Sequence, residues 1–356
     1  MKKFLLINPF GIGDVLFTTP VIKAIKDAAP DSFIGYWCNE RVAPLLKNFP
    51  LIDKVFVYNR GDIKRIAAKN KFKAAGLWMG LFAGIKKERF DIAFDFSLEH
   101  RYSFLAQSAG IPKRIGFNFK GRGKFLTDAI NIHGYADRHV VEYYVDLLKL
   151  SGIPVTEPKM FLSFSEDAFS RAKNLLRQHG LEGSAPVIGI SPGGGASWGK
   201  DAEYKHWPAE NFASLADRLS EELGAKIVLV GAGDEVEIAG QVEKTVKMPL
   251  VNLAGKTSLE ELCAVIKNCA VLVTNDGGPL HIAVAQGVKT VSIFGPVDEK
   301  VYGPFPVSDF YRALKSTVAC RPCYKNFRFS GCNNNRACLT GISVDEVFEA
   351  VTKVMT

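Results

Sequence analysis

Short apolar runs alternate with helical patterns along almost the whole chain. The runs are rich in β-branched and aromatic residues and are bounded by turn formers, which is the pattern of buried strands in a parallel sheet. In the first part we expect strands at Phe4–Asn8, Phe33–Trp37, Val55–Tyr58, Ile92–Phe96 and Arg114–Phe117. The helical patterns between them are Asp14–Ala28, Arg41–Asn48 and Arg138–Leu150.

A stretch rich in turn-forming residues, 151–158, interrupts this pattern, which then starts again. The second series has strands at Val187–Ser191, Lys226–Val230, Leu250–Leu253, Ala270–Thr274 and Thr290–Phe294. Its helices are expected at Glu166–His179, Pro208–Leu223, Val236–Thr245, Leu259–Lys267 and Pro279–Gln286. Two successive βαβ series predict an α/β protein with two Rossmann-like, doubly wound domains and a central cleft between them.

The domain boundaries follow from this break. We expect a first domain over 1–156, a second over 157–342, and a C-terminal helix within 343–356. The sequence leaves open whether that helix packs back on the first domain. A length of 356 residues agrees with two domains, since single cores stop growing at about 250–300 residues.

Composition places the chain among ordinary globular proteins, with 47% apolar and 23% charged residues. The sequence holds no apolar run near the ~20 residues of a membrane helix. The run Phe4–Ile7 is too short for a signal peptide and fits a first buried strand. We therefore expect a cytoplasmic protein.

The net charge of +8 is uneven, because residues 1–156 hold 24 Lys and Arg against 14 Asp and Glu. Much of the excess lies in 60–89, including Lys64 and Arg65, and in 113–124, including Arg122. A solvated surface explains such charges as well as a surface that meets phosphates of a lipid or an anionic acceptor. Nucleic acid is not an expected partner, because no nucleic-acid-binding motif accompanies the charge.

The first strand ends in a turn with Gly11, Gly13 and Asp14. Open α/β sheets bind ligands at such strand ends. A dinucleotide site would have a third glycine where Leu16 stands, and Asp14 would repel a pyrophosphate, so NAD binding is not expected here. Asp14 is either a cap of the following helix or a general base.

Three glycines, Gly193–Gly195, follow the first strand of the second series, with Ser197 close behind. Their backbone amides suit an anion, although no Walker sequence is present. Lys205 lies a few residues further on and is either a phosphate contact or a surface lysine. A third strand end carries Asp234 and Glu235, which suit ribose hydroxyls or a helix cap.

The most specific segment is the turn Asp276-Gly277-Gly278-Pro279, which opens a helix after a β-branched strand. Amides at a helix start bind phosphates, so we expect a diphosphate here. His281 would stand in the first turn of that helix, near the same site, although a lone helical histidine is more often packed or solvated.

The seven cysteines fall into two groups. Cys38, Cys263 and Cys269 lie in regular elements and are expected to be inert. Cys320, Cys323, Cys332 and Cys338 share the loop 320–338. A structural zinc or another thiolate-bound metal is one interpretation of this spacing, and disulfides or free thiols are the others.

Taken in order, these segments resemble glycosyltransferase family nine, the bacterial heptosyltransferases of lipopolysaccharide core assembly. The matching pieces cover nearly the whole chain: Gly-x-Gly-Asp-Val-Leu at 11–16, Ser-Pro-Gly-Gly-Gly at 191–195, Lys-His-Trp-Pro at 205–208, Gly-Ala-Gly-Asp-Glu at 231–235, Asp-Gly-Gly-Pro-Leu-His at 276–281 and Phe-Gly-Pro at 294–296. Each piece alone is weakly specific, whereas the ordered set is strong.

The resemblance implies a GT-B fold, an acceptor site in the first domain and a nucleotide-sugar site in the second. Asp14 matches the family's proposed base, and the resemblance implies an inverting transfer that needs no catalytic metal. The implied donor-binding set is Gly194, Gly195, Ser197, Lys205, Glu235, Glu237, Asp276, Gly277, Gly278 and His281. The family has Thr or Ser where Gly277 stands, so only backbone contact is implied there.

The acceptor is expected to meet Gly11, Gly13, Lys64, Arg65 and Arg122. The resemblance implies ADP-heptose as donor and an anionic glycolipid as acceptor. Together with the location of the basic charge in the first domain, it leads us to expect peripheral contact with the inner membrane. Alternatives are a transferase for another nucleotide-sugar and a non-catalytic nucleotide-sugar-binding protein. A dehydrogenase and a metal-dependent nucleic-acid binder have less support.

Overall fold

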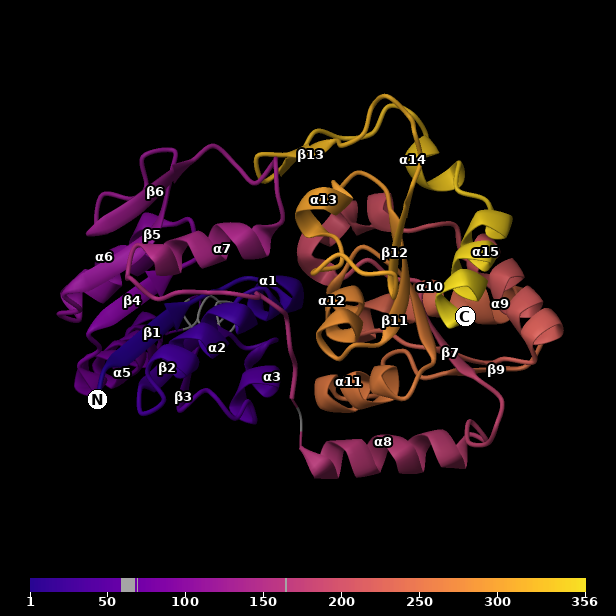
Figure 1. The fold of residues 1–356 in the computed structure, drawn as a ribbon, viewed down its shortest axis with the longest axis horizontal. Helices are drawn as coiled ribbons and strands as arrows, with labels where there is room; N and C mark the ends of the chain where they lie inside the picture. Colours follow the sequence, from indigo (N-terminus) through magenta and orange to yellow (C-terminus); the bar gives the residue numbers. More distant parts are fainter. Residues whose placement is uncertain (59–67, 69, 164) are drawn as a thin grey trace. The chain divides into compact units, whose positions relative to one another are not determined.

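The computed structural model describes residues 1–58, 68, 70–163 and 165–356, and it divides into two compact units. The first unit comprises Met1–Tyr135 and Val140–Lys159, and the second comprises Ala136–His139 and Met160–Thr356. Figure 1 labels the elements of both.

The first unit is built on one parallel sheet. Its strands, in the order β3-β2-β1-β4-β5-β6, are all parallel to their neighbours. Their bounds are β1 (Lys3–Ile7), β2 (Phe33–Asn39), β3 (Lys54–Tyr58), β4 (Ile92–Asp95), β5 (Lys113–Phe119) and β6 (Asp128–Ile132). The central strands β1 and β4 are buried almost throughout, as continuous apolar runs predict.

Helices cover both faces of this sheet. They are α1 (Ile12–Leu16), α2 (Thr19–Ala28), α3 (Ala43–Lys47), α5 (Lys71–Glu88), α6 (His100–Ser108) and α7 (Val140–Lys149). α2 packs against α7, while α5 and α6 contribute to the core on Leu5, Ile7 and Ala93. The expected single helix over 14–28 is two helices. The Thr18 hydroxyl donates to the Val15 carbonyl (2.6 Å) where the first helix ends, and Pro20 lies in the first turn of the second helix.

The second unit repeats the architecture. Its sheet has the order β12-β11-β10-β7-β8-β9 and is also parallel. The strands are β7 (Val187–Ser191), β8 (Lys226–Leu229), β9 (Leu250–Asn252), β10 (Val271–Asn275), β11 (Lys289–Phe294) and β12 (Tyr311–Lys315). A short antiparallel pair, β13 (Tyr324–Lys325) and β14 (Arg328–Phe329), lies in the cysteine-rich loop.

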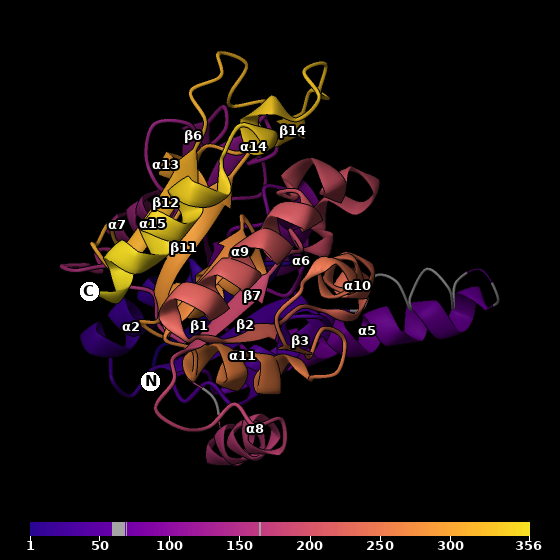
Figure 2. The same ribbon diagram turned by 90° about the vertical axis from the view of Figure 1, so that its right-hand side faces the viewer.

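Its helices are α8 (Glu166–Gln178), α9 (Ala209–Leu223), α10 (Val236–Thr245), α11 (Leu259–Lys267), α12 (Gly278–Ala285), α13 (Glu299–Tyr302), α14 (Ala337–Thr340) and α15 (Val344–Met355), with 3₁₀ segments η1 (Ala196–Lys205) and η2 (Gly233–Glu235). α11 packs against both α8 and α12, and α10 and α15 pack against α9 (Figures 1 and 2). The helix whose packing the sequence left open, α15, packs on α9 and β11 of the second unit, because Val347, Val351 and Val354 join that core.

The predicted α/β class with two doubly wound domains is confirmed. In each sheet the first strand of the series lies beside the fourth, β1 beside β4 and β7 beside β10, and the winding reverses there. The expected elements lie within a few residues of the observed ones, whereas β6, β12, α5 and α6 were not predicted, and neither were the short elements α13, α14, β13, β14, η1 and η2. Among the described residues, no helix combines the length and apolarity required to cross a bilayer.

Candidate functional site

The loop after β1 is held by two asparagine side chains. Asn8 donates to the Asp14 carbonyl (2.9 Å) and accepts from the Phe10 amide (3.1 Å). Asn39, at the end of β2, donates to the carbonyls of Pro9 (3.0 Å) and Phe10. These contacts fix the turn that carries Asp14 at the winding reversal of the first sheet.

Asp14 is the third residue of α1, whose N-cap position is held by Gly11. It therefore does not cap the helix as its N-cap residue, although it lies in the acidic first turn. The residue is half-buried, and one carboxylate oxygen lies 3.8 Å from where a Cβ on Gly11 would stand. Tyr36 lies close by. Burial raises its pKa well above 10, the Asp14 charge raises it further, and its hydroxyl bonds to Thr18 (2.8 Å).

The sequence alone did not identify a second carboxylate at this edge of the sheet. Asp95 ends β4 and is in register with Ile7, the last residue of β1. Its side chain is buried and accepts from the Ser97 amide (2.9 Å), and burial raises its pKa to about 6. The signal that could have found it is an aspartate inside a buried apolar strand.

The basic residues predicted to meet the acceptor are only partly described. Arg122 follows β5 and forms an ion pair with Glu99 (2.8 Å), which follows β4. Lys64 and Arg65 lie outside the described residues. Gly11 and Gly13 lie in the α1 turn itself.

In the second unit, Glu235 holds the glycine loop that follows β7. One carboxylate oxygen accepts from the Gly195 amide (3.0 Å) and the other from the Ala232 amide (2.8 Å). Burial raises the pKa of Glu235, and the two amides oppose that change. Gly193 is required because a Cβ there would lie 1.9 Å from the Glu235 Oε1 atom. Gly195 adopts a φ of 76°, which favours glycine.

Asn275 joins the glycine loop to the end of β10. Its amide donates to the Pro192 carbonyl (2.7 Å) and the Gly193 carbonyl (3.2 Å), and its oxygen accepts from the Trp207 amide (3.0 Å). Sequence reasoning passed over this residue, whose only signal was an asparagine directly after a buried strand.

Lys205 and Asp276 form a buried ion pair at the centre of this region. Their Nζ and Oδ2 atoms are 2.9 Å apart, and the side chains are 6% and 9% exposed. The lysine also lies over the Trp198 ring (5.4 Å). Lys205 is therefore not a surface lysine, and its charge partly opposes the rise that burial causes in the pKa of the nearby Glu235.

The start of α12 completes the cluster. Gly277 is the N-cap residue, and the backbone of Gly194 lies against it so closely that a Cβ on Gly277 would stand 3.1 Å from the Gly194 carbon. Gly278 and Pro279 form the first turn. His281 is buried in the helix, where burial and then the Lys205 charge lower its pKa to about 3. It is therefore a neutral imidazole at neutral pH.

The structure thus brings most of the predicted donor-binding residues together. Gly194, Gly195, Lys205, Glu235, Asp276, Gly277 and Gly278 converge at the winding reversal of the second sheet. Glu237 is exposed in the first turn of α10. The side chain of Ser197 lies outside what the structure describes. A buried lysine beside glycine-loop amides and a helix start is an arrangement that stabilises an anion such as a phosphate.

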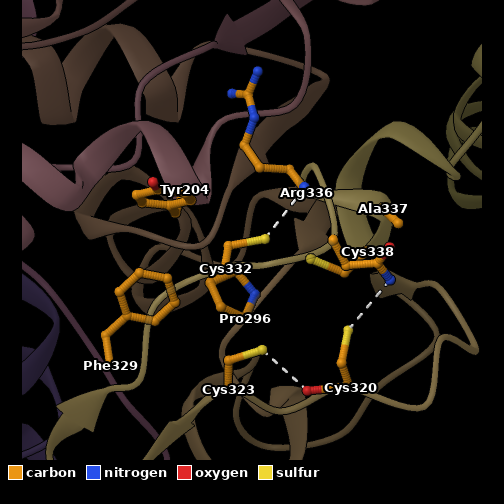
Figure 3. A pocket seen from close by; sticks show the side chains of 10 residues that line it. Tyr204, Pro296, Cys320, Cys323, Phe329, Cys332, Arg336, Ala337 and Cys338 are labelled. Atoms are coloured by element: carbon orange, nitrogen blue, oxygen red, sulfur yellow. Dashed lines mark hydrogen bonds between the residues drawn. The ribbon is translucent and has the colours of Figure 1, made fainter.

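The four clustered cysteines line one pocket together with aromatic residues (Figure 3). All seven cysteines of the chain are described and are free thiols. The Arg336 amide donates to the Cys332 sulfur (3.3 Å), and burial raises the pKa of Cys338 to about 11. The predicted structural zinc is not supported, because no group of three or more His, Cys, Asp or Glu among the described residues is arranged to hold a metal ion.

The cysteine-rich loop also packs on the segment that carries Lys205. Phe329 contacts Trp198 and Tyr204 of η1, with ring centroids 4.8 and 5.1 Å apart. Arg336 donates to the Glu203 carbonyl (3.2 Å). This loop therefore packs against η1, including the Trp198 ring over which Lys205 lies.

Comparison with known proteins gives consistent matches. The family model for glycosyltransferase family 9 (heptosyltransferase) matches residues 78–332. Lipopolysaccharide heptosyltransferase 2 of Escherichia coli K12 is 27% identical over 310 residues, or 83% of each chain. The crystal structure of a family 9 glycosyltransferase from Veillonella parvula is 25% identical with a TM-score of 0.82, covering 99% of this chain and 97% of that one. E. coli ADP-heptose lipopolysaccharide heptosyltransferase II, at 24% identity, has a TM-score of 0.76 with 100% and 98% covered.

Proposed function

Because the chain belongs to glycosyltransferase family 9, we propose that it transfers a heptosyl group from ADP-heptose to the core saccharide of a lipopolysaccharide. Relatives named as lipopolysaccharide heptosyltransferases support the acceptor, and a structural neighbour named for ADP-heptose supports the donor. The observation that carries the proposal is the buried Lys205–Asp276 pair beside the glycine loop and the start of α12.

The second unit would bind the donor. The diphosphate would lie against the Gly194 amide and the amides at the α12 start, with Lys205 supplying the positive charge. Glu235 accepts from the Gly195 amide of the glycine loop and from the Ala232 amide of its own turn, so it would fix the shape of that loop and could accept a ribose hydroxyl with its remaining lone pairs. His281, as a neutral imidazole, would offer hydrogen bonding and no charge.

The first unit would supply the base. In a single displacement, an acceptor hydroxyl attacks the anomeric carbon as its proton passes to the Asp14 carboxylate. The bond from the anomeric carbon to the diphosphate oxygen breaks in the same step, and ADP leaves. Attack opposite the leaving group inverts the anomeric configuration. Lys205 and the helix amides would stabilise the departing charge, so no catalytic metal is required.

Two experiments test this assignment. A thermal-shift panel of ADP-, UDP- and GDP-sugars identifies the donor, and a coupled assay for released nucleotide diphosphate identifies turnover. We expect stabilisation by ADP-heptose and ADP release only when acceptor is present. A protein stabilised by the donor that never releases ADP would instead be a nucleotide-sugar-binding protein, and a response to UDP- or GDP-sugars would move the donor assignment.

Asp14→Asn separates base from binding. We expect turnover to be lost while ADP-heptose still raises the melting temperature, because the substitution removes the proton acceptor and leaves the second unit intact. Asp27→Asn, an exposed aspartate on α2 paired with Lys23, is the matched control and should retain full turnover. Full activity in Asp14→Asn would remove it as base, and a product of retained configuration by NMR would exclude the single displacement.

The acceptor implies work at a membrane. A glycolipid acceptor is held in a bilayer, and the basic first unit would favour an anionic surface. We therefore propose peripheral action at the cytoplasmic face of the inner membrane, with Arg122 near the acceptor's anionic groups.

A further inference from the structure

The helix α5 (Lys71–Glu88) carries an uncharged, apolar segment that is not buried. Residues 75–84 contain no charged side chain, and all ten, each of them described, are partly or fully exposed. Leu77 and Met79 are 46% and 65% exposed. Contiguous exposed apolar surface of this kind marks an interaction site more often than an ordinary solvated face.

One face of α5 accounts for its packing on the sheet. Trp78, Leu81 and Phe82 pack against the core of the first unit, and Ile85 is buried there. The Trp78 ring lies 4.7 Å from that of Tyr58 on β3, the edge strand of the sheet. These residues recur at helical spacing, so they form one stripe. Figure 2 shows α5 extending away from the sheet beyond β3.

The remaining face is the one that needs explanation. It is formed by Ala75, Gly76, Leu77, Met79, Gly80 and Ala83, which we call the α5 strip. A helix face that is meant for water usually carries charged residues. Here small residues bring the backbone close to the surface, and the two larger apolar side chains stand at the edges of the strip.

Lysines stand at both ends of the same face. Positions 73, 76, 80, 83 and 87 are spaced by three or four residues, so exposed Lys73 and Lys87 lie in line with the strip. Lys86 and Arg89 are also exposed near its C-terminal end. Glu88, the single acidic residue of α5, faces Lys54 (2.7 Å) and Lys3 (3.4 Å). The strip is therefore apolar surface between two positive ends.

This charge arrangement disfavours a second copy of the chain as the occupant. A two-fold interface requires a self-complementary surface. Antiparallel packing of two strips would place Lys73 of one helix near Lys87 of the other, and parallel packing would place like lysines together. Either arrangement sets positive charge against positive charge, with no acidic partner on the strip.

We propose that the α5 strip lies in the surface of an anionic lipid bilayer, with Leu77 and Met79 at the acyl boundary and the lysines on headgroup phosphates. Ten helical residues span about 15 Å, half the hydrocarbon thickness, so the helix lies in the plane of the surface and does not cross it. Lysine stems reach from apolar surface to the headgroups. The inference deepens the membrane action proposed above, yet its test needs neither donor nor acceptor.

The test is flotation of the full-length protein with lipid vesicles. One set of vesicles contains zwitterionic lipid alone, and the other contains zwitterionic and anionic lipid at about 3:1, roughly the charge of a moderately anionic membrane. We expect the wild type to float with the anionic vesicles and to dissociate as salt rises. Leu77→Ser/Met79→Ser should lower the partition coefficient about tenfold, from the lost apolar burial. Lys73→Ser/Lys87→Ser should lower it about thirtyfold on anionic vesicles.

Matched controls lie on the second unit. Val307→Ser/Phe310→Ser removes two apolar side chains of comparable exposure (95% and 57%), and Lys244→Ser/Lys353→Ser removes two exposed lysines. Both should float like the wild type, and all variants should keep the wild-type melting temperature.

Wild-type protein that does not bind vesicles, or a strip variant that floats like the wild type, overturns the proposal. A dimer in sedimentation that Leu77→Ser/Met79→Ser dissociates, without vesicle binding, would assign the strip to self-association. Failure here leaves sugar transfer untouched, because ADP release is measured separately on detergent-dispersed acceptor.

Discussion

Replacing Lys205 by methionine, alone and together with Asp276→Asn, separates what the buried pair does for stability from what it does for donor chemistry. The charged atoms are 2.9 Å apart and both side chains are over nine-tenths buried. At that distance and an effective dielectric constant of about 20, their attraction is about 6 kcal/mol before desolvation is counted. Desolvation of two ions offsets most of it, so the intact pair contributes little net stability.

The cost appears when one partner is removed. Lys205→Met leaves the Asp276 carboxylate buried without its cation, and Asp276→Asn leaves the ammonium without its nearest anion. We expect each single variant to lose about 3–5 kcal/mol of unfolding free energy. The double variant should lose clearly less than the sum, because neither charge is then left uncompensated.

Urea denaturation measures this, with fluorescence and circular dichroism compared so that separate transitions of the two units are recognised. Activity should follow a different order: Lys205→Met and the double variant should both lose turnover by about 10²–10³-fold, since both lack the cation at the leaving group. Lys200→Met, an exposed lysine of the same 3₁₀ segment, is the control and should change stability by less than about 0.5 kcal/mol. Additive losses in the double variant would refute the coupling, and normal turnover without Lys205 would refute its role toward the diphosphate.

Three further predictions concern a glycine, a buried carboxyl and metal removal. Gly193→Ala should weaken ADP binding and lower stability by about 1–3 kcal/mol, because its Cβ would displace Glu235. Gly233→Ala, which has open space around it, should change neither quantity; calorimetry measures the ADP binding and denaturation measures the stability. Burial raises the pKa of Asp95 from 3.8 to about 6, so the folded state holds this proton to higher pH than the unfolded chain does. The contribution of Asp95 to stability is therefore most favourable below about pH 4 and is lost as pH rises to about 6. Asp95→Asn should remove that fall and add up to about 3 kcal/mol at pH 7, and an unchanged pH profile would contradict the assignment. Turnover should persist in EDTA, and its loss with recovery on adding a divalent cation would overturn the metal-free mechanism.

Regular periodicity decided which elements the sequence could predict. α10 was predicted with its observed bounds because its apolar residues recur at helical spacing. α5 was not, because its middle is apolar on every side and gives no helical period. β12 (Tyr311–Lys315) is a half-buried edge strand of mixed polarity, so it lacks the apolar run that identified the central strands.

The candidate site was predictable where chemistry and turn formers coincide in a short segment. Asp276, Gly277 and Gly278 were predicted for that reason. Asn275 does not, since its importance lies in bonds to Pro192 and Gly193, more than 80 residues earlier in the chain. The partner of Lys205 was equally hidden, because no spacing relates it to Asp276. Local sequence gives the residue types at strand ends, and only the fold brings two strand ends together.

The two sheets share one strand order, and their winding reversals carry opposite chemistry. At the first reversal stand the carboxylates of Asp14 and Asp95 with the neutral Asn8, a set that can accept a proton and orient a hydroxyl. At the second stand Lys205 and the amides of the glycine loop and α12, a set that can hold a developing negative charge. A displacement that moves a sugar from a diphosphate to a hydroxyl needs one of each, a base for the proton and a cationic cradle for the leaving group. Because the shared topology alone would supply two equivalent ligand sites, the difference in side-chain charge at the two reversals is the reason we propose acceptor activation in the first unit and donor binding in the second.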